Sequence, residues 1–164
     1  MTTRLILVSD THIPARARAL PASVLAAARA ADVVVHAGDW VASHVLDELE
    51  TYAPVLGVYG NNDGEDLRAR LPEIARITIE GVRIAVVHDT GAAPGRERRM
   101  DAAFPDVDLL VFGHSHTPWD SVTLHGTRLL NPGSPTDRRR QPAGTFMTVT
   151  IAHGRLIGVD LVKV

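Results

Sequence analysis

Residues 5–12 read Leu-Ile-Leu-Val-Ser-Asp-Thr-His, a run of branched apolar residues that stops at a polar group. The same change occurs after the apolar runs 33–35, 84–87 and 109–112, and after the weaker run 55–59. Short apolar runs that end in turn residues are typical of strands buried in α/β proteins. The sequence therefore predicts five strands with polar side chains at their carboxyl ends.

Five polar clusters follow these runs. Each has an ordinary explanation by itself, such as a turn or a buried histidine, but their coincidence at five strand ends favours one shared site. The carboxyl ends of strands in an open α/β sheet border one crevice, so we expect the clusters to meet there. Carboxylate, amide and imidazole donors without sulfur suit ions such as Mn²⁺, Fe²⁺ or Zn²⁺. The clusters are Asp10-Thr11-His12, Gly38-Asp39, Gly60-Asn61-Asn62-Asp63, Val87-His88-Asp89 and Gly113-His114-Ser115-His116.

The order of the expected elements predicts an α/β fold with two sheets. The first half alternates strands and helices, which indicates a mainly parallel sheet; these elements are strand 4–9, helix 21–30, strand 32–37, helix 43–50 and strand 54–59. The second half reads as three hairpins, 74–79 with 82–88, 122–124 with 128–130, and 145–151 with 156–162, with helix 97–103 and strand 109–112 between them. A chain of 164 residues without an evident linker is expected to form one domain, residues 1–164.

Composition narrows the classes of function. The chain has no cysteine, which excludes disulfides, thiolate metal sites and thiol nucleophiles. Its formal net charge of −2 gives no reason to expect nucleic acid or an anionic membrane as a partner. The first apolar run is too short for a signal peptide and no run approaches a membrane span, so we expect a cytoplasmic protein.

Two other catalytic motifs can be checked directly. Gly113-His114-Ser115-His116-Thr117 nearly matches the nucleophile elbow Gly-x-Ser-x-Gly, but Thr117 stands where the strained turn requires a small residue. The glycine-rich phosphate loops of dinucleotide-binding proteins and P-loop enzymes do not occur. Ser115 is therefore not expected to be a nucleophile.

Taken in order, the five clusters resemble the signature of the calcineurin-like metallophosphoesterases. The short chain and Asn131-Pro132-Gly133-Ser134 resemble its small phosphodiesterase branch, which includes the eukaryotic retromer subunit of the same fold. The resemblance implies a four-layer α/β/β/α sandwich with two mixed sheets. It also implies two divalent metal ions at the edge of the sandwich, Mn²⁺ first, with Fe²⁺, Zn²⁺ and Ni²⁺ as alternatives.

The resemblance further implies which residues act in the site. It places Asp39 between the ions, with Asp39, Asn61 and His114 as catalytic residues and a hydroxide shared by both ions as the nucleophile. The ligands it implies are Asp10, His12, Asp39 and His116 for the first ion, and Asp39, Asn61, His88 and His114 for the second.

Several positions near these clusters leave more than one interpretation open. Many family members have histidine where this chain has Asn62, and an amide cannot act as a general acid. Asp89 either tunes His88 or points to solvent, with solvent favoured, and Asp63 either supports the ligand loop or caps a helix. His36 is expected to pack or to support the site rather than to ligate. Trp40 and Trp119 are expected to form pocket walls or a partner surface. Six arginines are expected to form a solvated face or to contact a phosphate: Arg96, Arg98, Arg99, Arg138, Arg139 and Arg140.

The leading hypothesis is a phosphodiesterase that acts on a small phosphate ester or nucleotide-like compound. The alternatives are a phosphomonoesterase and a scaffold of the same fold that binds protein partners. Eroded ligands would favour the scaffold, but every ligand position holds a competent donor. The sequence is compatible with a homo-oligomer.

Overall fold

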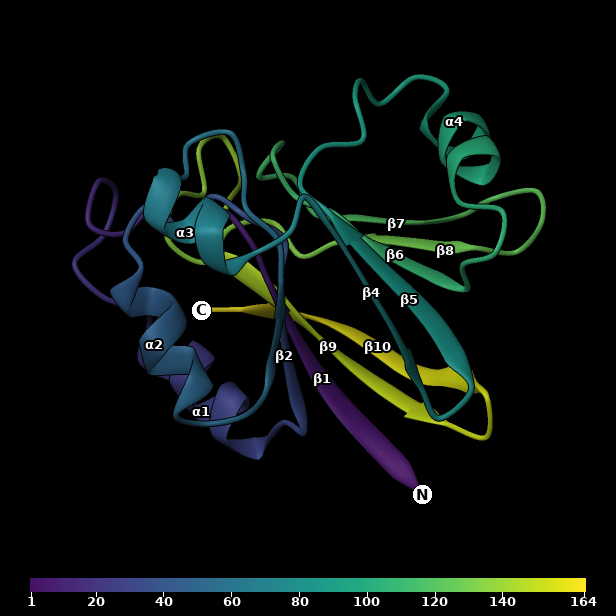
Figure 1. Ribbon diagram of the computed structural model, residues 1–164, viewed down its shortest axis with the longest axis horizontal. Coiled ribbons are helices and arrows are strands. Elements are labelled where there is room, and N and C mark those ends of the chain that lie inside the picture. The colour runs from purple at the N-terminus through teal and green to yellow at the C-terminus, as the bar shows by residue number, and fades with distance from the viewer.

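Two five-stranded sheets lie face to face between helices in the computed structural model, which describes residues 1–164 (Figure 1). The elements are, in chain order, β1 (Thr2–Val8), α1 (Ala22–Ala30), β2 (Val33–His36), α2 (His44–Glu50), β3 (Val55–Gly57), α3 (Glu65–Arg70), β4 (Ile74–Ile79), β5 (Val82–Val87), α4 (Arg96–Ala103), β6 (Leu109–Val111), β7 (Trp119–Val122), β8 (Arg128–Asn131), β9 (Thr145–Ala152) and β10 (Arg155–Lys163). None of the four helices has the length and apolar character that crossing a membrane requires.

Both sheets are mixed, as predicted. The first has the order β10-β9-β1-β2-β3, in which β1, β2 and β3 are parallel and β9 runs antiparallel to both of its neighbours, β1 and β10. The second has the order β4-β5-β6-β8-β7, in which β5, β6 and β8 are parallel and the two edge strands antiparallel. The parallel strands end at the same edge of the sandwich, so their following loops gather there.

The first strand shows why its apolar run is unbroken. Leu5 and Leu7 point to the space between the two sheets, where they pack against residues of the second sheet. Ile6 and Val8 point the other way and pack under the helices α1, α2 and α3. Successive side chains of a strand face opposite sides, so a strand buried on both faces has no polar alternation.

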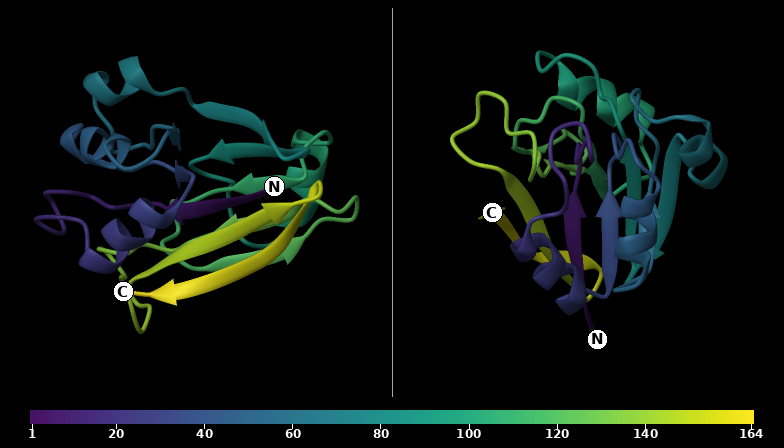
Figure 2. Two further views of the ribbon diagram at one scale, coloured as in Figure 1. Left: turned by 90° about the horizontal axis from the view of Figure 1, so that it is seen from below. Right: turned by 90° about the vertical axis from the view of Figure 1, so that its left-hand side faces the viewer.

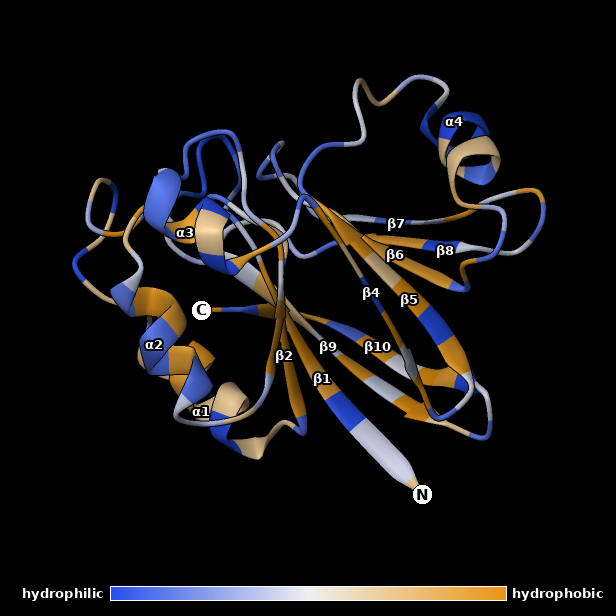
Figure 3. Ribbon diagram, in the orientation of Figure 1, coloured by the Kyte–Doolittle hydropathy of each residue, from blue (hydrophilic) through white to orange (hydrophobic).

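The second sheet is covered on its outer face by α4 alone. Leu110 and Phe112, near the end of β6, pack there with Phe104, which follows α4. The resulting layers are helices, sheet, sheet and helix, which confirms the predicted four-layer sandwich (Figure 2). Orange apolar segments mark the strand interiors in Figure 3, whereas several of the loops beyond the strand ends are blue.

Two of the predicted hairpins turn where expected, and the third differs. Glu80-Gly81 and His153-Gly154 both have positive φ angles, as a tight two-residue hairpin turn requires. The predicted strand 122–124 is instead β7 at 119–122, followed by a longer loop. That loop is closed by Thr123 and Thr127, whose backbone groups pair with each other, while the Thr127 hydroxyl donates to the carbonyl of Val107.

Candidate metal centre

The loops after β1, β2, β3, β5 and β6 converge at one edge of the sandwich, where both sheets end (Figure 1). The structure brings together all the side chains that the sequence singled out as ligands. They form two adjoining groups. The residues are Asp10, His12, His116, Asp39, Asn61, His88 and His114.

The first group contains Asp10, His12 and His116, whose nearest donor atoms all lie within 4.8 Å of one another. Asp10 Oδ1 lies 3.5 Å from His116 Nε2 and 3.9 Å from His12 Nε2. These three atoms are buried and have no hydrogen-bond partner. Buried polar atoms are nearly always paired, so three unpaired donors that face one point fit a cation.

The second group contains Asp39, His88 and His114, again with donor atoms within 4.8 Å of one another. The side-chain oxygen of Asn61 lies 3.0 Å from His88 Nε2 and 3.2 Å from His114 Nδ1. The group therefore offers one carboxylate, one amide oxygen and two imidazoles. Borderline divalent ions accept such a set.

One oxygen of Asp39 lies between the two groups. Asp39 Oδ2 is 3.3 Å from His12 Nε2 on one side and 3.4 Å from His88 Nε2 on the other. Asp10 Oδ1 also reaches a histidine of each group, but at longer distances, 3.5 Å from His116 Nε2 and 4.0 Å from His88 Nε2. The position of Asp39 Oδ2 is the one that a carboxylate shared by two ions requires.

Backbone carbonyls fix the orientation of two of the histidines. His88 Nδ1 lies 2.7 Å from the carbonyl oxygen of Ala37, and His116 Nδ1 lies 2.6 Å from that of Asp137. In each ring Nδ1–H is the donor, which directs Nε2 toward the carboxylates. Such bonds select the tautomer that binds a metal through Nε2.

The Asp10 carboxylate is held through its second oxygen. The Ser9 hydroxyl donates to Asp10 Oδ2 at 2.6 Å, and the His114 amide donates to the same oxygen at 3.0 Å. Ser134 also donates to the Asp10 carbonyl at 2.7 Å. These bonds leave Oδ1 free for a cation. Ser9 has no sequence signal beyond its place before Asp10, whereas Ser134 belongs to the Asn-Pro-Gly-Ser segment.

The backbone around the site is strained and tightly packed. Nine non-glycine residues have positive φ angles, and six of them lie in these loops: Asp10, His12, Asp39, Val41, His114 and His116. Such angles cost energy and persist where the surrounding structure enforces them, often at functional sites. A side chain at Gly60 would approach Asp39 Oδ1 to 2.2 Å, and one at Gly113 would approach Ser9 Oγ to 2.0 Å. The glycines of the motifs thus allow neighbouring loops to touch.

Burial and neighbouring groups shift the pKa values of two carboxyls and one histidine of the site. Burial raises the pKa of Asp10. Burial also opposes ionisation of Asp39, yet the adjacent His12 and His88 rings and the Asn62 amide hold the pKa of this carboxyl far below its usual range. Burial opposes protonation of His88, but Asp39 and Asp10 raise its pKa to about 9. Without a cation, His88 therefore carries a proton at neutral pH, and a cation that binds here displaces it.

The calcineurin-like phosphoesterase superfamily domain matches residues 3–154 of this chain. The chain belongs to this family. A probable metallophosphoesterase of Methanothermobacter thermautotrophicus is 39% identical over 136 residues, which cover 79% of this chain and 76% of that protein. Membership supports a metal-dependent phosphoesterase, and it confirms the resemblance found in the sequence.

Solved structures share the whole fold of this phosphoesterase. A Thermotoga maritima protein has a TM-score of 0.77 and 31% identity, with 99% of both chains covered. Vps29 of Entamoeba histolytica in complex with Zn²⁺ has a TM-score of 0.79 and 26% identity, with 98% of both chains covered. A structure described as a novel archaeal phosphodiesterase has a TM-score of 0.73, 18% identity, and coverage of 98% of this chain and 99% of that one. The last similarity shows the fold alone.

Two further residues of the phosphoesterase motif hold the Asp39 loop. Asp63 accepts hydrogen bonds from the backbone amides of Asp39, Val41 and Gly60 at 2.7–3.0 Å, and it does not cap α3. It therefore ties the loop after β2 to the loop after β3. Asn62 donates from its side chain to Asp39 Oδ2 at 2.8 Å and from its backbone to Oδ1 at 2.9 Å. No pattern in the sequence predicted this contact.

The Asp89 side chain is exposed and lies near His114. Its Oδ2 lies 3.7 Å from His114 Nε2, and its Oδ1 accepts the Gly91 amide at 2.8 Å. His114 is itself 45% exposed, so it stands at the entrance of the site. The favoured expectation that Asp89 points to solvent is confirmed, because its side chain is 52% exposed. The alternative that it tunes His88 is wrong, because its nearest histidine is His114.

The expectations for Trp40 and Arg96 were wrong, whereas Arg99 is exposed as expected. Trp40 is fully buried, stacks on His36 with ring centroids 3.5 Å apart, and donates to the Val58 carbonyl. It is a core residue and not a pocket wall. Arg96 is buried between the rings of Phe112 and Trp119, and it donates to Thr90 and Gly91. Arg99 donates to carbonyls of residues 90–94. Both arginines stabilise the loop after β5.

His36 is buried and packs as expected. Its Nδ1 accepts the Gly38 amide, and its Nε2 faces the Thr11 hydroxyl at 3.1 Å. Burial and the nearby His88 lower its pKa well below the usual value, so the ring is neutral. It supports the Asp39 loop without facing either donor group.

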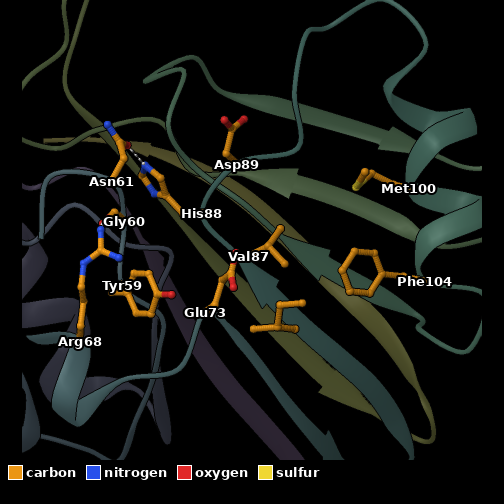
Figure 4. A pocket seen from close by; sticks show the side chains of 11 residues that line it. Tyr59, Gly60, Asn61, Arg68, Glu73, Val87, His88, Asp89, Met100 and Phe104 are labelled. Atoms are coloured by element: carbon orange, nitrogen blue, oxygen red, sulfur yellow. Dashed lines mark hydrogen bonds between the residues drawn. The ribbon is translucent and has the colours of Figure 1, made fainter.

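A cavity of about 420 Å³ opens beside the second group. In Figure 4 it extends from Tyr59 and Asn61, in the loop after β3, across Val87 and His88 to Met100 and Phe104 near α4. Its lining residues are Tyr59, Gly60, Asn61, Arg68, Glu73, Ile74, Val87, His88, Asp89, Met100 and Phe104.

Proposed function

We propose that this protein is a phosphodiesterase that hydrolyses small phosphate esters or nucleotide-like compounds with two divalent ions. The observation that carries the proposal is the position of Asp39 Oδ2 between a histidine of each donor group. One site at the convergence of five loops is then complete without any residue from another chain. Hydrolysis of a phosphate ester is the chemistry that such paired sites support.

The proposed ligands follow the two groups. Asp10, His12 and His116 hold the first ion with Asp39, and Asn61, His88 and His114 hold the second with the same Asp39. The unpaired atoms of the first group support this assignment. Mn²⁺ is our first choice because all donors are oxygen or nitrogen, with Fe²⁺, Zn²⁺ and Ni²⁺ as alternatives. Such ions, when bound, activate water and offset the charge of the phosphoryl group.

The side chains of the site have separate tasks in this proposal. Asp39 sets the spacing of the two groups, and Asn62 and Asp63 keep it in place. Asn61 contributes a neutral oxygen, which leaves its ion more electrophilic than a second carboxylate would. His114 and Asn61 are the two exposed ligands and therefore face an arriving phosphate.

The preference for diesters is supported by the charges around the second group. Asn62 is a neutral amide already engaged with Asp39, so it neither protonates a leaving group nor balances added charge. Glu73 and Asp89 line the adjoining cavity with two carboxylates. A monoester carries close to two negative charges above its second pKa of about 6, whereas a diester carries one. The diester meets less repulsion here.

The test compares a monoester and a diester that share a leaving group, and then a series of esters whose leaving groups differ. The chain is loaded with Mn²⁺ and assayed with 4-nitrophenyl phosphate, bis(4-nitrophenyl) phosphate and alkyl esters of graded leaving-group pKa. We expect the aryl diester to have the highest kcat/KM and the rate to fall steeply as the leaving-group pKa rises. General acid catalysis, which this site lacks at Asn62, is typically worth about 10²–10⁴-fold. Faster monoester hydrolysis, or a rate independent of the leaving group, would favour the phosphomonoesterase.

A scaffold of the same fold is the second candidate, and the similarity to Vps29 favours it. It predicts that partner binding survives when the donor groups are emptied. Asp39→Asn separates the two functions, because it leaves the outer surface unchanged. A wild-type chain that binds metal yet turns over none of the mono- and diesters would support the scaffold.

A further inference from the structure

The cavity beside the second donor group arises from incomplete cover of the second sheet. Ile74 on β4 stands directly opposite Val87 on β5, so both side chains lie on the same face of the sheet. Val87 packs there with Phe104, but α4 has only eight residues and leaves this corner open. Ile74 is 46% exposed, which is high for an isoleucine on a sheet. An apolar floor therefore lies open next to the site.

The cavity is continuous with the candidate metal centre. Asn61 and His88 line it and also belong to the second group, with Asn61 Oδ1 only 3.0 Å from His88 Nε2 (Figure 4). A substituent on a phosphate held at the second group can enter the cavity without crossing protein. The volume of about 420 Å³ lies in the range of ligand sites and greatly exceeds the size of a methyl group.

The walls of the cavity specify the kind of group that fits. Ile74, Val87, Met100 and Phe104 form the apolar part of the lining. Tyr59, in the loop after β3, lies across from Met100 and Phe104 (Figure 4). Apolar and aromatic surfaces favour a ring, which adds stacking contacts to the burial of its faces.

The polar residues of the cavity argue against a second anionic group. Arg68 lies 4.4 Å from the Tyr59 ring, and its guanidinium donates to the carbonyls of Asp63 and Gly60. Its donors are therefore partly engaged. Glu73 forms no ion pair, and together with Asp89 it makes the lining net negative. Carboxylates accept hydrogen bonds from ring N–H groups and repel anions.

We propose that this cavity is a specificity site for an uncharged aromatic or heteroaromatic group of the phosphate ester, and that it selects aryl or nucleoside-type diesters over alkyl diesters. The inference rests on the proposed function, because the phosphate is placed at the candidate metal centre. It extends that function by naming the organic substituent, which the cavity selects and the metal ligands do not.

The first test keeps the leaving group constant. Bis(4-nitrophenyl) phosphate and methyl 4-nitrophenyl phosphate both release 4-nitrophenolate, but only the first retains an aromatic group. We expect the wild type to prefer the first, and Ile74→Ala to reduce that preference about tenfold, mainly through KM. Ile77→Ala is the matched control, since Ile77 lies on the same strand with similar exposure, 39% against 46%, and does not line the cavity.

The second test detects binding by a signal that does not depend on turnover. The chain has three methionines, and only Met100 lines the cavity, while Met147 is buried between the sheets. With methyl-labelled methionine and diamagnetic Zn²⁺ in place of Mn²⁺, phenyl phosphate is expected to shift the Met100 signal and leave that of Met147 unchanged. Methyl phosphate is expected to shift neither.

The two tests separate the two proposals. Hydrolysis without any preference for the aromatic substrate, together with an unmoved Met100 signal, would overturn the cavity assignment and leave the phosphodiesterase intact. A Met100 shift with phenyl phosphate in a protein that hydrolyses no ester would keep the cavity and remove the phosphodiesterase. Equal losses in Ile74→Ala and Ile77→Ala would assign the effect to the strand and contradict the proposal.

Discussion

Asp39→Asn is the most direct test of the proposal that the Asp39 carboxylate binds both ions. The two side chains have the same shape, so the amide of residue 62 keeps its contact with the Oδ1 position of residue 39. The change removes one negative charge from a point 3.3 Å and 3.4 Å from histidines of the two groups. At an effective dielectric constant of about 20, two unit charges 4 Å apart interact by about 4 kcal/mol. A divalent ion doubles that energy, so we expect a loss of at least about three orders of magnitude in affinity for each ion.

Metal content and turnover measure this effect together. Isothermal titration with Mn²⁺ should show both affinities weakened by at least about 10³-fold, and bis(4-nitrophenyl) phosphate hydrolysis should be lost at micromolar metal. Asp66→Asn is the control, because Asp66 is an exposed carboxylate on the adjacent α3. Circular dichroism should show the same fold for both variants. An Asp39→Asn protein that binds two ions with wild-type affinity would refute the reasoning.

Three further outcomes follow from the site. Asp63→Ala should lower the free energy of unfolding by about 3 kcal/mol, because three backbone amides lose their acceptor, and a melting temperature equal to that of Asp66→Ala would contradict this. In the metal-free protein, His88 binds its proton more tightly when folded, with a pKa of about 9 against 6.5. Its contribution of about 3 kcal/mol is thus present below pH 6.5 and lost as the pH rises through 9, and denaturant unfolding in EDTA should show that loss in the wild type but not in His88→Gln. Asn62→His should raise kcat for esters with poor leaving groups more than for aryl esters, by up to about 10²-fold; an equal change across a graded ester series would count against the missing general acid.

The apolar pattern was sufficient to predict two sheets because burial leaves a direct record in the sequence, whereas the four layers were predicted from the family resemblance. The run at residues 5–8 is apolar without alternation since Leu5 and Leu7 face one core and Ile6 and Val8 face another. Turn residues then mark the strand ends. Where a turn was closed by side chains instead, as by Thr123 and Thr127, the predicted strand was displaced.

The convergence of the ligands was predictable for a topological reason. Parallel strands end on one side, so clusters after β1, β2, β3, β5 and β6 had to approach one another. The clusters carry their own glycines, and Gly60 and Gly113 stand where any side chain would collide with Asp39 or Ser9. Pattern and topology together thus predicted which donors meet.

Contacts between distant loops could not be predicted in this way. The carbonyls of Ala37 and Asp137 that orient His88 and His116 belong to the backbone, which every sequence shares. The burial of Arg96 between Phe112 and Trp119 depends on how α4 meets the sheet. The open cavity likewise results from the shortness of α4, which exposes Ile74.

The most direct test of the central claim is an anomalous difference map from crystals grown with Mn²⁺. We expect two peaks about 3.5–4 Å apart, the spacing of two-metal sites, with a carboxylate oxygen of Asp39 between them. One peak should lie against Asp10, His12 and His116, and the other against Asn61, His88 and His114. A single peak at saturating Mn²⁺, or two peaks that Asp39 does not join, would contradict the claim.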